Sequence, residues 1–364
     1  MRVVIAGGGT GGHLYPGIAL AVTFQKLRAE ARILFIGTTQ GIGEEPLLKR
    51  GYQVESISVK GFIGKGLSGR LSSILSVPAA LLQSLRILKA FSPTLVIGIG
   101  GYAAGPVLLA AILLGLKRVI LEPNVVPGLS NRLVAPFCHM VVTAFEASRK
   151  RLRTNKISRL GMPVRPEILG PNTLGNRRDT EAISEKLGQR TLLILGGSQG
   201  AHSINRAMIA ALPALKDEHL FVIHQTGKTD RATVEAAYAA ARVPGRVMAF
   251  IEDMAGAYAS ADLVISRAGA GTLAELALVG KSSLLIPFPH AAGHQEENAK
   301  AFVSAGAALM LHDGELSGPV LAKSINALLA DPVRRQKMEA AALTQGNAHA
   351  AEAIVEACLA LSEA

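Results

Sequence analysis

Three apolar runs in this chain end directly in clusters of glycine, and this repeated arrangement limits the possible folds more than any other feature. The clusters span Gly7–His13, Gly98–Tyr102 and Gly196–Ala201, and a helical pattern follows each one. Glycine has no Cβ, so the backbone N–H groups of such a loop can approach a phosphate closely. The positive end of the following helix dipole points to the same place. The arrangement predicts an α/β protein that holds a phosphate-bearing ligand at helix N-termini.

The order of apolar runs and helical patterns predicts two domains of the same kind. Strand-like runs alternate with helical patterns, which is typical of parallel sheets with right-handed crossovers. The expected strands are Val3–Ala6, Arg32–Ile36, Leu95–Ile99, Val119–Leu121, Met140–Thr143, Thr191–Leu195, Leu220–Gln225, Val247–Phe250, Leu263–Ser266 and Ser283–Pro287. We therefore expect two Rossmann-like, doubly wound domains facing a cleft.

A stretch rich in proline and glycine, Gly161–Asn176, separates the two halves. Such a composition is typical of a linker, so we expect domains at 1–163 and 164–345. The C-terminal segment 346–364 contains a helical pattern. The sequence leaves open whether this helix packs on its own half or back on the first domain.

Length and composition agree with an ordinary globular enzyme. The 364 residues fit two domains, and 49% hydrophobic against 18% charged residues excludes a disordered chain. The two cysteines, Cys138 and Cys358, cannot form a disulfide framework. The sequence contains neither a Cys/His cluster nor an Asp-x-Asp pair, so we expect no bound metal and no cofactor.

The charge of the chain is unevenly distributed. Residues 1–165 contain 21 Lys or Arg and 6 Asp or Glu, whereas the net charge of the whole chain is +11. A first half this basic favours an anionic partner, such as a phosphorylated substrate or an anionic membrane surface. Nucleic acid is not favoured as a partner, because aromatic residues make up 4% of the chain and tryptophan is absent.

Two other enzyme classes match single loops. Gly7-x-Gly9-x-x-Gly12 has the spacing of a dinucleotide fingerprint, but the second strand ends in Phe35–Gln40 without a carboxylate for the ribose. Gly196-x-Ser198-x-Gly200 has the spacing of a hydrolase nucleophile elbow, with Asp262 and a later histidine as potential partners. An elbow leaves the other two glycine clusters unexplained, so both classes are disfavoured.

Two segments bear on contact with a membrane. The uncharged run Leu95–Leu116 is interrupted by glycines, so we expect a buried strand and then a buried helix from about Pro106, not a membrane span. Lys60–Phe91 alternates apolar and basic residues, which predicts a face that binds an anionic membrane surface. A core-facing helix with solvated basic residues is the alternative. The apolar residues are Phe62, Ile63, Leu67, Leu71, Ile74, Leu75, Leu81, Leu82 and Leu85.

The glycine clusters and the helix start Gly271–Glu275 together resemble the MurG family. These transferases add N-acetylglucosamine to the undecaprenyl-diphosphoryl-muramoyl-pentapeptide intermediate of peptidoglycan synthesis. The resemblance runs from Met1 to about Leu361 with the motifs in order. It implies the GT-B glycosyltransferase fold, with UDP-N-acetylglucosamine held by the second domain and lipid I, an undecaprenyl-diphosphate-linked acceptor, held by the first.

The resemblance also implies a peripheral enzyme at the cytoplasmic face of the cell membrane. Two alternatives stay open: another GT-B glycosyltransferase acting on a glycolipid, and a nucleotide-sugar binding protein without catalysis.

The substrate-binding candidates fall into two groups. The resemblance implies donor or sugar contacts for Thr10, Gly11, Gly12, Asn124, Arg165, Ser198, Gln199, Ile251, Glu275 and Gln295. Among these, Ile251 would contact uracil through its backbone, and Glu275 would bind the ribose. The residues themselves place the N–H groups of Ala270, Gly271, Thr272 and Leu273 for a phosphate, because they open a helix after a strand. An ordinary first-turn carboxylate is the alternative reading of Glu275.

The implied reaction is a single displacement with inversion at the anomeric carbon. The attacking C4 hydroxyl must lose a proton, so a general base with a pKa near neutrality is needed. His13, at the end of the first glycine cluster, is the first candidate, and Glu122 is the second. A helix cap or a ligand of the acceptor phosphate is the alternative role for His13.

Overall fold

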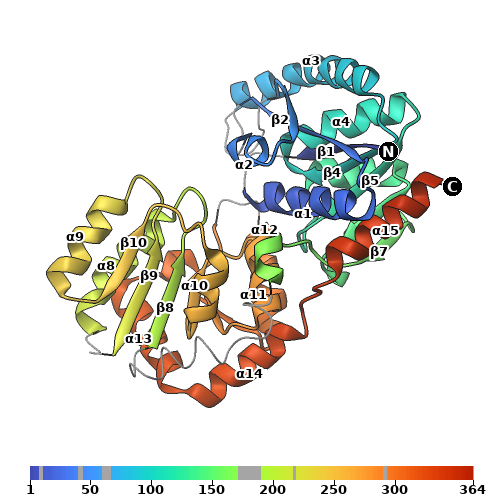
Figure 1. The fold of residues 1–364 in the computed structure, drawn as a ribbon. Helices are drawn as coiled ribbons and strands as arrows, with labels where there is room; N and C mark the ends of the chain where they lie inside the picture. Colours follow the sequence, from blue (N-terminus) through green and yellow to red (C-terminus); the bar gives the residue numbers. More distant parts are fainter. Residues whose placement is uncertain are drawn as a thin grey trace. The chain divides into compact units, whose positions relative to one another are not determined.

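The computed structural model divides the chain into two compact units (Figure 1). The first comprises Met1–Arg165 and Asn347–Ala364, and the second comprises Pro166–Gly346. The structure describes residues 1–7, 11–39, 44–59, 67–170, 190–215, 219–289 and 293–363, without the side chains of residues 11, 44 and 67–75. Each unit contains one parallel sheet, so the prediction of two Rossmann-like domains is confirmed.

The first unit is built on a seven-stranded parallel sheet with the order β3-β2-β1-β4-β5-β6-β7. Its strands are β1 (Arg2–Gly7), β2 (Arg32–Thr38), β3 (Gln53–Ile57), β4 (Leu95–Gly100), β5 (Lys117–Glu122), β6 (Met140–Thr143) and β7 (Ile157–Arg159). Every residue of β4 is buried, as expected for a central parallel strand covered on both faces. The strand order reverses between β1 and β4, which brings the ends of these two strands together.

Helices cover both faces of this sheet. They are α1 (Gly11–Leu27), α2 (Glu44–Leu48), α3 (Leu67–Phe91), α4 (Gly101–Leu113), α5 (Leu129–Val134) and α15 (Ala350–Glu363), with 3-10 turns η1 (Ala135–Phe137) and η2 (Glu146–Arg151). α4 begins at Gly101, so the expectation that it starts near Pro106 was wrong. The left-handed φ values of Gly100 and Gly101 let the chain turn from β4 directly into the helix.

The C-terminal helix α15 belongs to the first unit, where it packs against α1. Lys26 of α1 forms an ion pair of 3.0 Å with Glu352, and Arg28 forms one of 3.1 Å with Glu363. Both pairs are exposed to solvent, so each contributes little to stability. The apolar face of the helix, with buried Ile354, Val355 and Cys358, makes the larger contribution.

The second unit repeats the plan with a six-stranded parallel sheet in the order β10-β9-β8-β11-β12-β13. Its strands are β8 (Arg190–Leu195), β9 (Leu220–Gln225), β10 (Gly245–Met248), β11 (Leu263–Ser266), β12 (Ser283–Leu285) and β13 (Ala308–Met310). β10 begins and ends two residues before the predicted strand Val247–Phe250. The reversal of strand order falls between β8 and β11.

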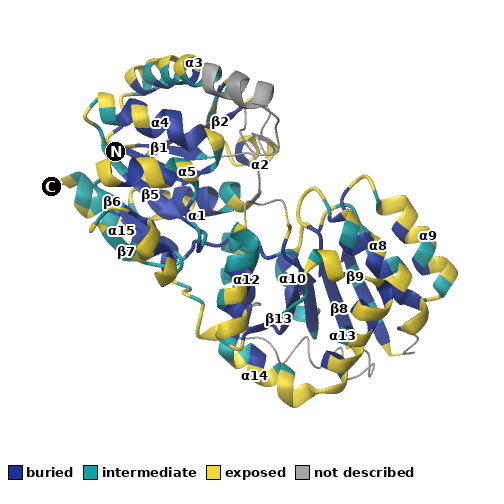
Figure 2. Ribbon diagram, turned by 180° about the vertical axis from the view of Figure 1, so that it is seen from behind, coloured by how far each residue is buried: buried dark blue, intermediate teal, exposed yellow. Residues whose placement is uncertain are grey.

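The helices of the second unit also lie on both faces of its sheet (Figure 1). They are α8 (His202–Ala211), α9 (Arg231–Ala241), α10 (Met254–Ser260), α11 (Ala270–Val279), α12 (His294–Ser304), α13 (Gly318–Ala330) and α14 (Pro332–Leu343), with 3-10 turns η3 (Pro166–Leu169), η4 (Leu212–Ala214) and η5 (Asp313–Glu315). α8, α9 and α13 share one apolar core with the sheet. Figure 2 shows buried strands in both units and exposed outer faces on the helices.

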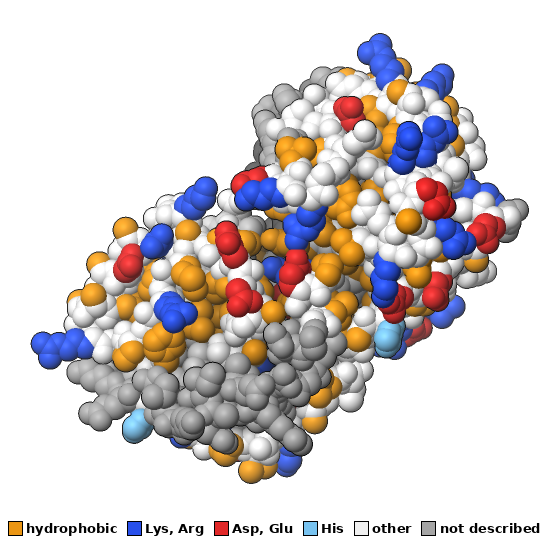
Figure 3. Space-filling model, in the orientation of Figure 1, with side chains coloured by type: hydrophobic (Ala, Val, Ile, Leu, Met, Phe, Trp, Pro, Cys, Tyr) orange, Lys and Arg blue, Asp and Glu red, His pale blue; other side chains and the backbone are white. Residues whose placement is uncertain are grey.

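The predicted membrane face on Lys60–Phe91 lies only partly within the described residues. Leu81 and Leu85 of α3 pack against the core of the first unit, whereas Leu82 is exposed. The described half of α3 therefore matches the core-facing alternative more closely. Among the helices described, none has the length and apolar character needed to cross a bilayer. On the visible face of the first unit, Lys and Arg side chains are spread out and not gathered in one cluster (Figure 3).

Candidate functional site

In the first unit, functional candidates gather where β1 and β4 end side by side. Ligands of doubly wound sheets usually bind at such a reversal of strand order. α1 begins with Gly11 and Gly12, and His13 lies in its first turn. The imidazole Nε2 of His13 is 3.2 Å from the position that a Cβ would occupy at Gly100. Glycine at position 100 therefore gives the ring its space, and two of the predicted glycine clusters meet here. Thr10 lies outside the described residues.

Glu122 ends β5 and is almost fully buried in a set of donors. Its Oε1 accepts hydrogen bonds from the backbone N–H (2.9 Å) and the side chain (3.3 Å) of Asn124. Its Oε2 accepts from the N–H of Gly128 (3.0 Å) and from Nδ2 of Asn131 (2.8 Å). Burial raises the pKa of this carboxyl, and the four donors oppose that shift.

This arrangement corrects the expectation that Glu122 is a candidate base. A carboxylate offers about four lone-pair sites, and four donors already occupy them. Glu122 is also 1% exposed, so an acceptor hydroxyl cannot reach it without displacing those donors. Its role in the structure is to hold the loop that carries Asn124, whose carbonyl oxygen in turn accepts from Ser148 (2.9 Å).

Arg165 lies over the first helix of the same unit. Its guanidinium carbon is 4.0 Å from the centre of the Tyr15 ring, two residues beyond His13. A guanidinium over an aromatic face is held electrostatically by the ring quadrupole. The structure therefore brings Arg165 next to α1, beside the residues of the first glycine cluster.

In the second unit, most of the predicted donor-binding residues follow β8 and β11, the two strands at the reversal of order, whereas Ile251 follows β10 and Gln295 follows β12. Ser198 and Gln199 lie after β8 and are exposed. Gly200 has a left-handed φ, and a Cβ there would collide with the carbonyl oxygen of Thr226. Glycine is thus required at position 200 partly so that the loops after β8 and β9 can touch, and not only for contact with a phosphate.

α11 follows β11 with its N-terminus at the same edge of the sheet. Gly269 is the N-cap, so the N–H groups of Ala270, Gly271 and Thr272 have no acceptor within the helix. The N–H of Leu273 already donates to the carbonyl of Gly269 (3.0 Å). The expectation that Leu273 offers its N–H to a phosphate was therefore wrong, and its side chain is buried in the core.

Glu275 lies in the second turn of α11 and is 5% exposed. The hydroxyl of Tyr258, from α10, donates to its Oε2 at 2.9 Å. Its burial and this partner distinguish it from the solvated first-turn carboxylate of the alternative reading. Tyr258 was not predicted, because the contact joins two helices that are separated in the sequence by β11.

Ile251 follows β10 and is held by the side chain of Gln225, the last residue of β9. Oε1 of Gln225 accepts the N–H of Ile251 (2.9 Å), and its Nε2 donates to the carbonyl of Gly197 (2.8 Å). Since the N–H of Ile251 is engaged, its carbonyl oxygen is the group that could recognise uracil. Gln225 was not among the predicted residues.

Two further contacts shape the loops after β11 and β12. Oε1 of Gln295, in the first turn of α12, accepts the N–H of Phe288 (2.9 Å). Arg267, directly after β11, donates to Ser203 of α8 (2.8 Å) and forms an ion pair with Asp313 (2.5 Å). The bond to Ser203 ties the start of α8 to the loop before α11, and the mostly buried ion pair ties the same loop to η5.

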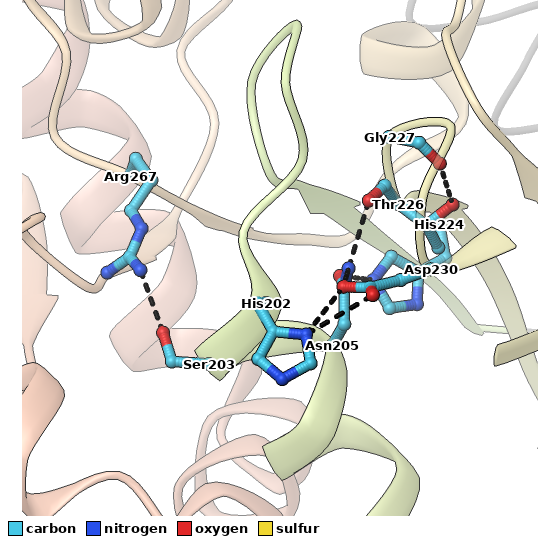
Figure 4. Close-up of polar contacts among 8 residues, drawn as sticks. All are labelled: His202, Ser203, Asn205, His224, Thr226, Gly227, Asp230 and Arg267. Carbon is cyan, nitrogen blue, oxygen red and sulfur yellow. Dashed lines mark hydrogen bonds and ion pairs between the residues drawn. The ribbon is translucent and has the colours of Figure 1, made fainter. Parts of the chain in front are cut away.

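A buried polar chain holds the loop after β9 in place (Figure 4). Nδ2 of Asn205 donates to the carbonyl of Thr226 (2.9 Å) and to Asp230 (2.8 Å). Its Oδ1 must then accept from Nε2 of His224 (3.0 Å), so Nδ1 of His224 accepts from the hydroxyl of Tyr238 (3.2 Å). Burial lowers the pKa of His224 to about 3, which keeps the ring neutral in this chain of donors.

Two parallel sheets with glycine-rich loops and helix N-termini at their reversals define an α/β protein of two Rossmann-like domains that is suited to a phosphate-bearing ligand. Comparison with known families agrees with this class. Residues 3–143 match the glycosyltransferase family 28 N-terminal domain, and residues 191–354 match the C-terminal domain of that family. The chain belongs to glycosyltransferase family 28, and the resemblance to the MurG family is confirmed.

Similar proteins cover the chain from end to end. It is 42% identical, over 99% of both chains, to a UDP-N-acetylglucosamine–N-acetylmuramyl-(pentapeptide) pyrophosphoryl-undecaprenol N-acetylglucosamine transferase of Syntrophus aciditrophicus. A transferase with the same name from Thermodesulfovibrio yellowstonii is 43% identical, over 98% of this chain and 97% of its own. The crystal structure of Acinetobacter baumannii MurG has a TM-score of 0.76 at 30% identity and 98% coverage of both chains.

Proposed function

We propose that this chain transfers N-acetylglucosamine from UDP-N-acetylglucosamine to the C4 hydroxyl of the N-acetylmuramoyl sugar of lipid I. The products would be lipid II and UDP. The observation that carries the proposal is the similarity to transferases of this activity at 42% identity over 99% of both chains, which includes both units.

The second unit has the groups that a UDP-sugar requires. The diphosphate suits the N–H groups at the start of α11, which belong to Ala270, Gly271 and Thr272. Ser198 follows β8, the strand next to β11, and its hydroxyl would join them. These donors would stabilise the negative charge that develops as UDP leaves. The carboxylate of Glu275 suits the two ribose hydroxyls, and the carbonyl of Ile251 suits uracil. Gln199 and Gln295 would orient the sugar.

The first unit would supply the general base for the acceptor hydroxyl and further contacts to the donor. His13 is the proposed general base, because its imidazole lies where β1 and β4 end at the reversal of strand order, the usual ligand position of a doubly wound sheet. Glu122 positions Asn124, which would face the sugar. Arg165, Gly11 and Gly12 keep their predicted roles near the diphosphate and the donor.

We further propose that the enzyme works as a peripheral protein at the cytoplasmic face of the membrane, and that apolar side chains on α4, α5 and η1 contribute to its membrane contact. Five exposed apolar side chains on α4, α5 and η1 define an α5 patch: Leu109, Leu113, Leu129, Leu133 and Phe137. Leu129 and Leu133 are 68% and 65% exposed, which is unusual for large apolar residues at helical spacing.

Cationic side chains border the α5 patch. Arg132 lies on α5 between the two leucines and is exposed. Arg118 donates to the carbonyl of Phe137 (2.7 Å), and Lys156 donates to that of Cys138 (3.2 Å). Apolar side chains surrounded by cations fit insertion into an anionic lipid surface.

The experiment is a transfer assay with a short-chain lipid I analogue and either UDP-N-acetylglucosamine or UDP-galactose as the donor. We expect UDP release and a disaccharide product with the first donor and a much slower reaction with the second. UDP binding without transfer to any acceptor would point instead to a non-catalytic binding protein. Transfer only to other glycolipids would change the assigned acceptor.

A further inference from the structure

Gln225 connects the loop after β8 with the loop after β10 through hydrogen bonds of its side chain. Among the described residues, no other side chain bonds to both loops. It is the last residue of β9 and is 4% exposed. Its side chain donates to the carbonyl of Gly197 on one side and accepts the N–H of Ile251 on the other, at 2.8 and 2.9 Å. Its own carbonyl oxygen accepts the N–H of Gly196 (3.2 Å).

The strand register explains why this one side chain reaches both loops. β9 lies between β8 and β10, and Gln225 is level with Leu195 of β8 and with Met248 of β10. Leu195, Gln225 and Met248 are each the last residue of their strands. The carboxamide therefore continues the hydrogen-bond ladder beyond the end of the sheet, where the backbones have already separated into loops.

The chemistry of the contact requires an amide. One partner is a carbonyl, which needs a donor, and the other is an N–H, which needs an acceptor. A carboxamide supplies both, whereas an ionised carboxylate is acceptor-only and a leucine supplies neither. Ile251 is buried, so losing its bond would leave its N–H unsatisfied, whereas Gly197 is exposed and its carbonyl can turn to water.

The two loops serve different parts of the proposed donor. Gly197 directly precedes Ser198, which is proposed to contact the diphosphate, and Ile251 is proposed to contact uracil. We infer that Gln225 is a positioning residue that sets the spacing between the uracil and diphosphate contacts of the donor site. The inference rests on the proposed function and adds to it the group that matches the site to the length of a nucleoside diphosphate.

Asn205 provides a useful contrast. It also holds a loop at this edge, through Thr226 and Asp230, but no described contact joins it to Ile251. The connection between the diphosphate loop and the uracil loop is thus a property of Gln225.

The test is calorimetric titration of the whole chain with UDP between about pH 5 and 8, for the wild type, Gln225→Glu, Gln225→Leu and Gln336→Glu. Gln336 is exposed on α14, so its variant adds the same charge away from the site. Each affinity is divided by that of the wild type at the same pH, which removes the titration of UDP itself. Circular dichroism at each pH verifies that the variants are folded.

We expect Gln225→Glu to bind UDP at least about tenfold more weakly than the wild type at pH 8, because a carboxylate faces the carbonyl of Gly197. As the pH falls, the protonated carboxyl can donate to Gly197 and still accept from Ile251, so the ratio should recover towards one. Gln225→Leu should stay weak at every pH, and Gln336→Glu should stay near one. Uridine, which lacks the diphosphate, should lose less affinity than UDP in Gln225→Leu.

Other results would separate the two claims. If the wild type binds UDP but the Gln225→Glu ratio does not change with pH, or if Gln225→Leu binds UDP normally, the inference about Gln225 is wrong and the proposed function stands. If uridine and UDP lose the same affinity in Gln225→Leu, Gln225 supports the fold and does not set the spacing. A wild type that does not bind UDP contradicts both.

Discussion

The phenol oxygen of Tyr258 lies 2.9 Å from Oε2 of Glu275, and both side chains are buried. Tyr258 comes from α10 and Glu275 from α11, so this hydrogen bond fixes the carboxylate relative to the neighbouring helix. A carboxylate held in this way is ready to accept from two adjacent hydroxyls without losing further side-chain freedom. The relationship therefore supports the assignment of Glu275 to the ribose.

Replacing Glu275 should remove discrimination at the ribose. The wild type should bind UDP more tightly than 2′-deoxy-UDP by about tenfold or more, since a hydrogen bond to a charged group contributes about 1.5–3 kcal/mol. Glu275→Ala should bind both nucleotides with similar, weaker affinity, and Tyr258→Phe should lie between it and the wild type. Competition binding measures the affinities of the wild type and both variants for the two nucleotides. If Glu275→Ala leaves the ratio of UDP affinity to 2′-deoxy-UDP affinity unchanged, Glu275 does not bind the ribose.

Removing His13 should slow the chemical step and leave donor binding intact. A general base contributes about 10²–10⁴-fold, so the kcat of His13→Gln should fall by that order while UDP affinity stays near that of the wild type. A base acts in its deprotonated form, so the wild-type kcat should decline at acidic pH as an imidazole is protonated, and the variant should lack this decline.

Glu122→Gln is the matched control for His13. Its amide N–H₂ must face either the two donors of Asn124 or the donors from Gly128 and Asn131, so we expect a loss of roughly 1–3 kcal/mol in unfolding free energy. The pH dependence of kcat should stay that of the wild type. If Glu122→Gln removed the acidic decline and His13→Gln retained it, the two assignments would have to be exchanged.

His224 should make the second unit sensitive to acid. Burial lowers its pKa from 6.5 to about 3, so the folded state binds the proton less readily than the unfolded state. The stability associated with the neutral ring is complete above about pH 6.5 and is lost as the pH falls toward about 3, by up to about 1.4 kcal/mol per pH unit.

His224→Gln, whose amide can still donate to Asn205, should have a shallower decrease in unfolding free energy over this range. Urea unfolding followed by circular dichroism at several pH values measures the difference. His202→Gln is the comparison: it removes an exposed imidazole that helps to lower the pKa of Asp230, so a change in its slope measures that pair and not the buried ring. Equal slopes in His224→Gln and the wild type would contradict the account.

Charges introduced into the α5 patch should release the protein from membranes. Leu129→Glu with Leu133→Glu should weaken sedimentation with anionic vesicles at low salt by at least about tenfold, because apolar insertion is lost and repulsion is added. Leu82→Glu, at an exposed position of α3, should change binding much less. If Leu82→Glu weakened vesicle binding more than the two substitutions on α5, the membrane face would lie on the predicted segment Lys60–Phe91.

The central strands and the glycine-rich loops could be predicted from the sequence because a buried parallel strand is one continuous apolar run. β3, with its alternating Gln53–Ile57 pattern, was missed, as were β7 and β13, which have three residues each. All three lie at an edge of their sheet, where a strand lacks the continuous buried apolar run of a central strand.

The contacts that organise the site could not be predicted in the same way. Gln225 meets Ile251 and Gly197 only because β9 lies between β8 and β10, and the role of Glu122 depends on the path of the loop that returns to it. Such pairs are 6 to 28 residues apart. The chemistry of each side chain was readable, but its partner depended on strand order and loop geometry.

The linkage in the product tests the central proposal most directly. The donor sugar is α-linked to UDP, so a single displacement by the C4 hydroxyl of the muramoyl sugar must give a β(1→4)-linked disaccharide. NMR of the product formed from UDP-N-acetylglucosamine and a short-chain lipid I analogue would show this linkage. An α linkage, attachment at another hydroxyl, or release of free N-acetylglucosamine would contradict it.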